Sequence, residues 1–125
     1  PGTAVHPVEP AGFDDTARSL AAGTRIENDP GARSICDALL APGPGILTFA
    51  INAHIAAAGL AVDDAAVGEA MRYAWRTLKL VVEPGGAVAL AAVLSGAFVA
   101  RDRNTVVVLS GGNVDPATYC GIIAG

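Results

Sequence analysis

An α/β fold is the class that the sequence predicts, and three segments carry that prediction. Residues 105–109, Thr-Val-Val-Val-Leu, form a continuous run rich in β-branched side chains, which is typical of an inner strand of a parallel sheet. Residues 84–100 are apolar all round, which predicts a helix covered on every side. Residues 63–80 keep helical spacing, with one expected buried face of Val67, Met71, Ala74, Trp75 and Leu78, and begin with aspartates that can cap a helix. We therefore expect an open, mostly parallel sheet flanked by helices in one domain, residues 1–125.

Shorter elements are expected between these three. They are two β-prone runs, 3–8 and 60–62, and three helical patterns, 13–22, 46–58 and 116–124. Gly23 is expected to cap the helix over 13–22, in which Asp14 and Arg18 have the i, i+4 spacing of an ion pair. Residues 24–45 are rich in turn formers, so we expect an irregular connection there.

Composition and charge exclude several classes of protein. The 125 residues carry 8 Lys+Arg against 12 Asp+Glu, and only 16% of them are charged. A net charge of -4 argues against a nucleic-acid or anionic-membrane partner. Residues 38–62 and 84–100 lack charged side chains, but prolines and glycines break the first. The second is shorter than the roughly 20 residues that a bilayer helix needs, so both are expected to be core segments.

The cysteines indicate the redox compartment of the protein, and the first residues indicate whether the chain begins inside a longer protein. Cys36 and Cys120 lie far apart, with no spacing typical of a disulfide framework or a zinc site, so we expect reduced thiols in a cytoplasmic protein. The first seven residues, Pro-Gly-Thr-Ala-Val-His-Pro, have no initiating Met and no signal-peptide pattern. We expect the chain to start inside a longer protein.

The turn Ser110-Gly-Gly-Asn113 is the most informative short motif. It follows the predicted strand 105–109, and ligands bind beyond the carboxyl ends of strands in open α/β sheets. Glycines let the backbone approach a ligand closely, and the serine offers one hydroxyl. The alternative is a plain tight turn, because the spacing of a nucleotide-binding loop is absent.

Glu9 and Asp15 are candidate ligands of a hard cation. They flank a turn, where two carboxylates and a backbone carbonyl can surround such an ion. The alternative, which spacing alone favours, is that Glu9 ends a strand and Asp15 lies at a helix start. No catalytic nucleophile can be assigned, because these candidates show no recognisable base arrangement: Ser34, Ser95 and Cys36, with His6 and His54.

Three segments, in this order along the chain, together resemble one family of enzymes. They are VEPAGFDDTARSLAAG over 8–23, LKLVVEPGGAVALAAVL over 78–94 and VVLSGGNVD over 107–115. They resemble the C-terminal part of the threonine/serine dehydratase and serine racemase family, which are fold-type II pyridoxal-phosphate enzymes. The resemblance implies the C-terminal part of the large domain of a tryptophan-synthase-beta-like fold.

The resemblance also implies an activity, a cofactor and an assembly. In the complete enzyme, pyridoxal phosphate would support an ammonia-lyase reaction that eliminates the β-hydroxyl of a hydroxy amino acid, giving a 2-oxo acid and ammonia. A serine or hydroxyaspartate racemase-dehydratase of the same family is the alternative within that class. A homo-oligomer is the expected assembly.

The family's functional residues carry over to matching positions in this sequence. Ser110 would meet the pyridine nitrogen of the cofactor, and Glu83 and Gly111 would line its pocket. A divalent or monovalent cation would bind Glu9, Asp15 and the carbonyl of Phe13, a position where the family commonly has alanine. Lys79 and Asn113 match two positions of a nucleotide effector site.

The sequence also departs from the family. The Schiff-base lysine, the asparagine beside the cofactor ring and the glycine-rich phosphate loop all precede the segment that matches Pro1. Lys79 is the only lysine, and it aligns with a different helix position. We expect no catalytic residue in this segment and no activity from it alone. It would need the N-terminal half of the fold, or act as a non-catalytic α/β fragment or partner subunit.

Overall fold

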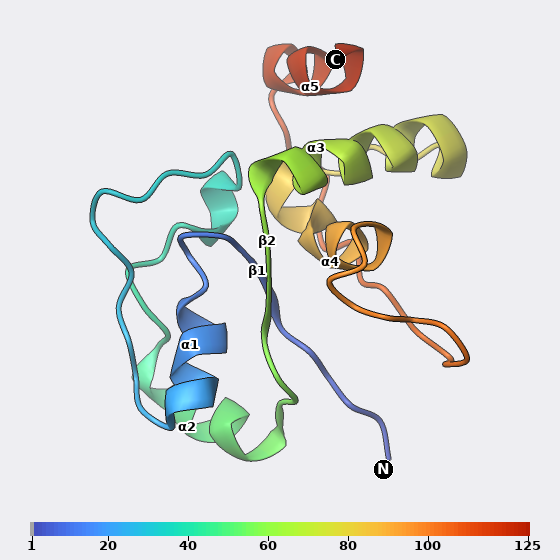
Figure 1. Cartoon of the computed structure of the whole chain (residues 1–125). Helices are drawn as coiled ribbons and strands as arrows, with labels where there is room; N and C mark the ends of the chain where they lie inside the picture. Colours follow the sequence, from blue (N-terminus) through green and yellow to red (C-terminus); the bar gives the residue numbers. More distant parts are fainter. Residues whose placement is uncertain (1) are drawn as a thin grey trace.

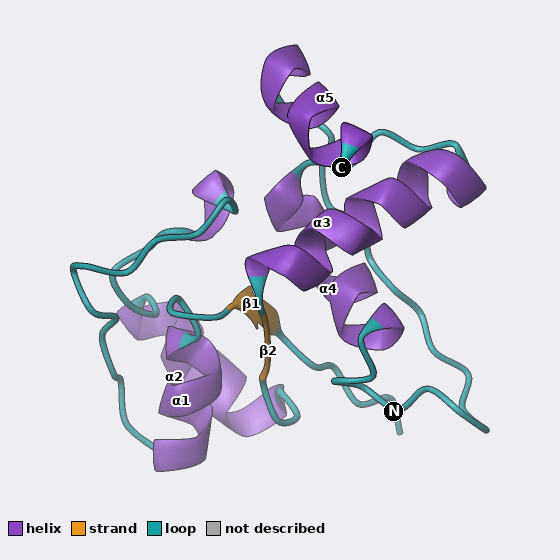
Figure 2. Cartoon of the chain, turned by 45° about the horizontal axis from the view of Figure 1, so that its top comes forward, coloured by secondary structure: helices purple, strands orange, loops and turns teal. Residues whose placement is uncertain are grey.

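The computed structural model describes residues 2–125 and shows an α/β arrangement around a two-stranded parallel sheet (Figures 1 and 2). β1 (Val8–Pro10) pairs with β2 (Leu60–Val62), and Val8 lies opposite Leu60. The helices are α1 (Asp15–Ala22), α2 (Ile46–Ile55), α3 (Asp64–Tyr73), α4 (Pro84–Leu94) and α5 (Pro116–Ala124), with a 3-10 turn η1 (Asp37–Leu39) and a π turn η2 (Ala74–Leu78). The irregular connection expected over 24–45 is confirmed apart from η1.

The end of α1 follows the sequence prediction, whereas the helix begins at Asp15 and not at the expected residue 13. Gly23 caps the helix in the left-handed conformation with φ 69°, which glycine adopts at little cost. Arg18 Nε lies 2.9 Å from Asp14 Oδ1, so the expected i, i+4 ion pair forms. Both features follow from local chemistry.

α3 begins as predicted and ends earlier. The Asp63 carboxylate accepts a hydrogen bond from Ala66 N–H at 2.7 Å, which makes Asp63 the N-cap. The helix then widens into η2, and Lys79 ends it with φ 61°. Because the π turn shifts the helical phase, Trp75 and Leu78 are exposed, and the expectation that they continue the buried face is wrong.

α4 confirms the predicted start over Glu83 and Pro84. Glu83 is the N-cap residue, and Pro84 occupies the first turn, where its missing N–H costs nothing. The expected end at residue 100 is wrong, because the helix stops at Leu94 and Gly96 turns the chain with φ 82°. The described chain itself buries most of this helix, which packs on α3, β1 and β2.

The core lies between α3 and α4. Several of its side chains have no exposed surface: Val67, Ala70, Met71, Ala74, Ala87 and Ala91. Alanines from both helices are among these fully buried residues. Among the described residues, no helix is both long and apolar enough to cross a bilayer.

Residues 105–109 do not form the expected inner strand. Val106 and Val108 are 89% and 66% exposed, whereas Val107 and Leu109 pack against the core. The alternation of a strand is therefore present, but within residues 2–125 the backbone of 105–109 makes no hydrogen bond to a neighbour. A strand needs a partner strand for its N–H and C=O groups, and no described segment supplies one.

Candidate functional site

The two glycine motifs, over 83–86 and 110–112, lie against each other although they are distant in the sequence. Glu83 N–H donates to Gly111 O at 3.0 Å. A β-carbon at Gly86 would lie 2.6 Å from Gly111 O, and one at Gly112 would lie 2.6 Å from Val81 O. A β-carbon at Gly111 would overlap the Glu83 carboxylate. Gly86 and Gly112 are therefore needed because two backbones touch, whereas Gly111 lies against the Glu83 side chain.

This contact builds a polar corner at the start of α4. Glu83 is the N-cap residue there, at the end of the helix that carries partial positive charge. Ser110 is exposed, and within residues 2–125 no hydrogen bond joins its hydroxyl to another residue. The corner thus brings the backbone of Gly111, the residue after Ser110, against Glu83.

Glu9 and Asp15 lie together, as the candidate cation site requires. Both line a cavity of about 250 Å³, which Thr48 and Asn52 also line. Phe13 is buried and is not among the lining residues. Within the described chain, no cluster of three or more His, Cys, Asp or Glu side chains is placed to hold a metal. The two carboxylates would therefore need carbonyl or water ligands.

Glu9 also has a structural role. Its Oε1 and Oε2 accept hydrogen bonds from Thr16 N–H at 3.1 Å and Ala17 N–H at 2.9 Å, so β1 caps the first turn of α1. Burial raises the pKa of Glu9, and the negative charge of Asp15 adds to that rise, while the hydrogen bonds from Thr16 and Ala17 oppose it. Both interpretations of Glu9 made from the sequence are thus compatible with its position.

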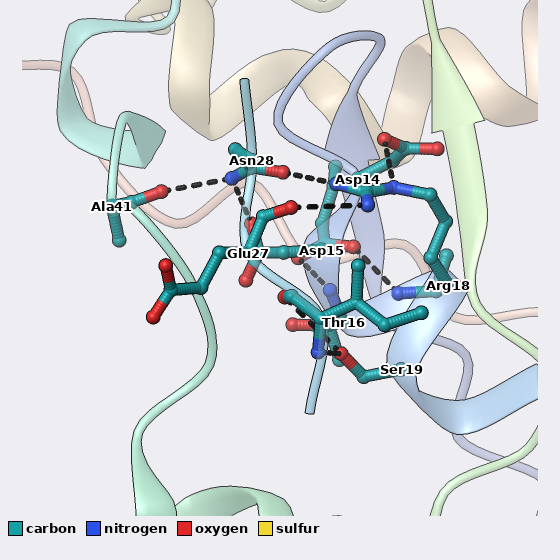
Figure 3. A network of polar contacts seen from close by, with 11 residues as sticks. Asp14, Asp15, Thr16, Arg18, Ser19, Glu27, Asn28 and Ala41 are labelled. Carbon is teal, nitrogen blue, oxygen red and sulfur yellow. Dashed lines mark hydrogen bonds and ion pairs between the residues drawn. The ribbon is translucent and has the colours of Figure 1, made fainter. Parts of the chain in front are cut away.

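Asn28 is the residue near this site that sequence reasoning missed. Its side chain is buried and donates to Asp15 Oδ1 at 2.5 Å and to Ala41 O at 2.9 Å (Figure 3). Arg18 Nη2 donates to Asn28 Oδ1 at 2.5 Å and Arg18 Nη1 to Glu27 O at 3.2 Å. Asn28 orients Asp15, but it lies in a turn-rich segment where asparagine is ordinary. No local signal could have found it.

The remaining candidates are placed as follows. Lys79 is exposed, and its Nζ donates to Arg76 O at 2.8 Å. Asn113 is exposed just beyond the glycine contact, and no hydrogen bond joins it to Lys79 within the described chain. The effector interpretation of this pair therefore stays a prediction.

The candidate nucleophiles make contacts that stabilise the fold. Ser34 Oγ donates to Asp64 Oδ1 at 2.6 Å and accepts from Cys36 N–H at 3.1 Å, which ties the loop to the start of α3. Cys36 is fully buried, and burial raises the pKa of its thiol to about 11. His6 contacts Ala58 O through Nδ1 at 2.9 Å. Ser95 Oγ accepts from Ala97 N–H at 3.4 Å. No histidine among the described residues is hydrogen-bonded to any of these three candidates.

Comparisons with known proteins place the chain in a family. Residues 1–111 match the family described as pyridoxal-phosphate dependent enzyme. A serine racemase of Arabidopsis thaliana is 39% identical over 120 residues, which cover 92% of this chain and 36% of that protein. A beta-hydroxyaspartate dehydratase of Paracoccus denitrificans (strain Pd 1222) is 34% identical over 115 residues, which cover 92% of this chain and 36% of that protein.

A solved structure gives the same assignment. The threonine deaminase of T.th. superposes with a TM-score of 0.83 at 38% identity, over 90% of this chain and 41% of that chain. This chain therefore belongs to the pyridoxal-phosphate dependent enzyme family, with a tryptophan-synthase-beta-like fold and pyridoxal phosphate as the family's cofactor. It spans 36% to 41% of the length of these three relatives.

Proposed function

We propose that this chain supplies one wall of the pyridoxal-phosphate site of an ammonia-lyase that acts on a small β-hydroxy amino acid. The observation that carries the proposal is the contact between residues 110–112 and 83–86, which places the backbone of Gly111, next to the exposed Ser110, against Glu83 at a helix start. The relatives named serine racemase, threonine deaminase and beta-hydroxyaspartate dehydratase support the substrate class.

The residues of this corner fit one edge of the cofactor ring. Ser110 has an exposed hydroxyl with no partner among the described residues, which suits the pyridine nitrogen, and Glu83 and Gly111 would line the pocket next to it. Pyridoxal phosphate, when bound, supplies the electron sink that stabilises negative charge on the substrate's α-carbon. A neutral serine hydroxyl does not hold a proton on the ring nitrogen as a carboxylate would. Ser110 therefore moderates that sink and favours elimination of the β-hydroxyl.

The lysine that would bind the cofactor covalently is proposed to come from outside these 125 residues. Lys79 is the single lysine of the sequence, it is exposed, and its Nζ donates to a backbone carbonyl. The chain alone is therefore proposed to be inactive. If pyridoxal phosphate gave an absorbance band with this chain that Lys79→Met abolished, this part of the proposal would be wrong.

A chimera tests the reaction. The matched part of the Paracoccus denitrificans dehydratase is replaced by this chain, and 2-oxo acid is measured with L-serine, L-threonine and 3-hydroxyaspartate. We expect product from at least one of them. Ser110→Ala should lower the rate about tenfold, the equivalent of one hydrogen bond of roughly 1.4 kcal/mol. Ser95→Ala, an exposed serine at the end of α4, is the control.

Two outcomes would contradict the lyase proposal. One is a folded chimera that binds pyridoxal phosphate and forms no 2-oxo acid from any of the three substrates. The other is a Ser110→Ala chimera as active as Ser95→Ala. The racemase alternative, which the identity to a serine racemase supports, is separated by measuring D-serine formed from L-serine in the same chimera.

We also propose that Glu9 and Asp15, with the carbonyl of Phe13, bind a hard divalent or monovalent cation. The proposal of a cation site is supported by the cavity that Glu9 and Asp15 share, because Thr48 and Asn52 add oxygen-bearing side chains to its wall. Because the pKa of Glu9 is raised, protons compete with the cation more strongly than at an ordinary glutamate. Calorimetric titration with MgCl₂ and KCl should therefore show weaker binding at pH 5.5 than at pH 8. Equal binding by Glu9→Gln would contradict the site.

Lys79 and Asn113 remain a proposed nucleotide effector site. Both are exposed, and Lys79 follows the π turn at the end of α3. The test is the effect of ATP on the activity and melting temperature of the chimera, with Lys79→Met as the variant. An ATP effect that survives this substitution, or no ATP effect at all, would refute the proposal.

A further inference from the structure

The segment that carries Ser110 is held to the rest of the described chain by few direct bonds. Over residues 104–114, a single backbone hydrogen bond reaches another described segment, from Glu83 N–H to Gly111 O. The close contacts at Gly86 and Gly112 come from residues without side chains that could interlock. Groups that must keep a fixed place in a site need support from the elements behind them.

The element directly behind this segment is α5. The Asp115 carboxylate accepts hydrogen bonds from Ala117 N–H at 2.9 Å and Thr118 N–H at 3.0 Å, so it caps the start of the helix. Asp115 follows Gly112 by three residues, which span at most about 11 Å when fully extended. The position of α5 therefore limits where the segment at 110–112 can lie.

One aromatic side chain anchors α5 on α3, beside which it lies in both views of the chain (Figures 1 and 2). Tyr119 is 7% exposed and belongs to the core. Its ring stands edge-on to that of Trp75, the single tryptophan of the sequence, with centroids 6.1 Å apart. Its buried hydroxyl has no hydrogen-bond partner among the described residues. The ring, and not the hydroxyl, therefore supplies the anchor.

Arg72 of α3 fixes the far end of α5. Its Nη1 donates to Ile122 O at 2.7 Å, one of the last carbonyls of α5, which lack a partner within the helix. Arg76 Nη2 adds a longer contact to Ile123 O at 3.3 Å. Arg72 also pairs with Glu69 at 2.8 Å, but the Glu69 side chain is 72% exposed, so that ion pair contributes little. The contact that ties α5 to α3 is the one to Ile122.

The other half of the polar corner is attached to the same helix. α3 continues through η2 to Lys79, and Glu83 follows four residues later. Val81 O, on this short connection, is the atom that Gly112 approaches. Glu83 is therefore attached to α3 through the chain, whereas the segment at 110–112 is attached to it through α5.

We propose that Arg72 and Tyr119 are positioning residues of the polar corner. By docking α5 on α3, they keep the segment at 110–112 against Glu83. Neither side chain is hydrogen-bonded to the corner within the described chain, so both act through α5. The inference rests on the proposed function only where it treats the corner as a wall of the cofactor site.

Amide exchange followed by NMR tests the docking in this chain without cofactor. The Glu83 N–H reports on the corner directly, because its exchange requires the bond to Gly111 O to open. The amides of Leu90 and Ala91, buried in the middle of α4, are the reference. Arg72→Met should speed the exchange at Glu83 at least about tenfold relative to that reference, because the Gly111 segment loses its support. A general loss of stability would instead speed all three amides together.

Matched variants separate the docking from other effects of substitution. Tyr119→Phe keeps the ring and should leave the exchange ratio unchanged, whereas Tyr119→Ala should match Arg72→Met. Arg72→Lys keeps a donor for Ile122 O and should recover part of the protection. Arg33→Met removes an arginine that donates only to carbonyls of its own loop, 30–32, and should have no effect. Circular dichroism checks that each variant is folded.

The chimera with the Paracoccus denitrificans dehydratase gives a second readout. Its affinity for pyridoxal phosphate, measured by absorbance titration, should fall about tenfold with Arg72→Met, because a loosened wall must be ordered on binding. Arg33→Met should leave the affinity unchanged. Faster exchange at Glu83 with unchanged affinity would support the docking and contradict the cofactor wall, so the two failures are distinguishable.

Two results would overturn the positioning role. One is an exchange ratio at Glu83 that neither Arg72→Met nor Tyr119→Ala changes. The other is an equal rise in that ratio with Arg33→Met.

Discussion

Glu9 connects β1 to α1 through both of its carboxylate oxygens, so a single side chain caps a helix that begins beyond the next turn. The sequence marks Glu9 as either the end of a strand or a cation ligand. Spacing cannot show that the amides of Thr16 and Ala17 come within reach, because that depends on the turn over 11–14. The sequence therefore predicts the cap by Asp63, which bonds an amide three residues further on, but not the cap by Glu9.

Removing the Glu9 carboxylate should destabilise the chain. Glu9→Ala leaves two amides of α1 without their acceptors, and we expect the free energy of unfolding in urea to fall by about 1–2 kcal/mol. Glu9→Gln keeps one acceptor oxygen and should lose less. Glu27→Ala is the control, since Glu27 contributes only its backbone carbonyl to the network. An equal effect of Glu9→Ala and Glu27→Ala would show that the cap contributes nothing.

The two thiols should differ in reactivity. Cys36 is buried with a pKa raised to about 11, whereas Cys120 is exposed. At pH 8 a disulfide reagent such as DTNB should therefore react rapidly with one thiol per folded chain and with two in urea. Cys120→Ser should leave no fast-reacting thiol. Labelling of Cys36 at the rate of Cys120 would contradict this burial.

Ionisation of the Cys36 thiol should lower the stability of the folded chain at high pH. Because the folded pKa of Cys36 lies above its ordinary value of 9.0, folding favours the neutral thiol. Its contribution to stability is complete below pH 9 and is lost as the pH rises toward about 11. Cys36→Ala should therefore reduce the loss of stability measured between pH 9 and 11.

At the scale of elements, the glycine motifs decide how the segment at 110–112 meets α4. Local reasoning assigns such glycines to turns, but Gly86 and Gly112 are needed for close backbone contact and neither has a positive φ. The motif order in the sequence suggests a common site, and only the packing of the two segments shows that their backbones touch.

Gly86→Ala should separate this contact role from ordinary helix propensity. The new β-carbon would lie 2.6 Å from Gly111 O, so we expect a loss of about 1–3 kcal/mol and a lower melting temperature. Gly121→Ala, in α5 with nothing within 4 Å of its β-carbon, should be neutral or stabilising by up to about 1 kcal/mol. Equal melting temperatures for the two variants would contradict the close contact.

At the scale of the whole molecule, the distribution of burial departs from what apolar runs predict. The alanine-rich helix α4 and the valine run over 105–109 both indicate core segments, yet the structure buries the first and exposes half of the second. The difference arises because α3 and the strands cover α4, whereas residues 105–108 line a cavity.

Substituting one buried valine and one exposed valine should show this difference in burial as a difference in stability. Val67→Ala removes two methyl groups from a fully buried site in α3 and should lower the free energy of unfolding by about 2 kcal/mol. Val106→Ala, at a site that is 89% exposed, should change it by less than about 0.5 kcal/mol. Urea unfolding of both variants checks this, and equal losses would mean that Val106 is buried in solution.

The sequence by itself determined the local features of this protein: the caps at Asp63 and Gly23, the Asp14–Arg18 pair, the start of α4 and β2 at its predicted bounds. It also predicted the family, because three family motifs that occur in the same order along the chain are specific for it. Each of these depends on residues within a few positions of one another or on a pattern that can be read directly.

Tertiary structure alone decided where distant groups meet. Asn28 holds Asp15, Glu9 caps α1, and residues 110–112 rest on the start of α4. It also decided that the valine run over 105–109 has no pairing partner among the described residues, since a strand depends on the backbone of a neighbour and not on its own side chains alone. Local chemistry acts along the chain, whereas pairing, burial and close backbone contact depend on which segments the fold brings together.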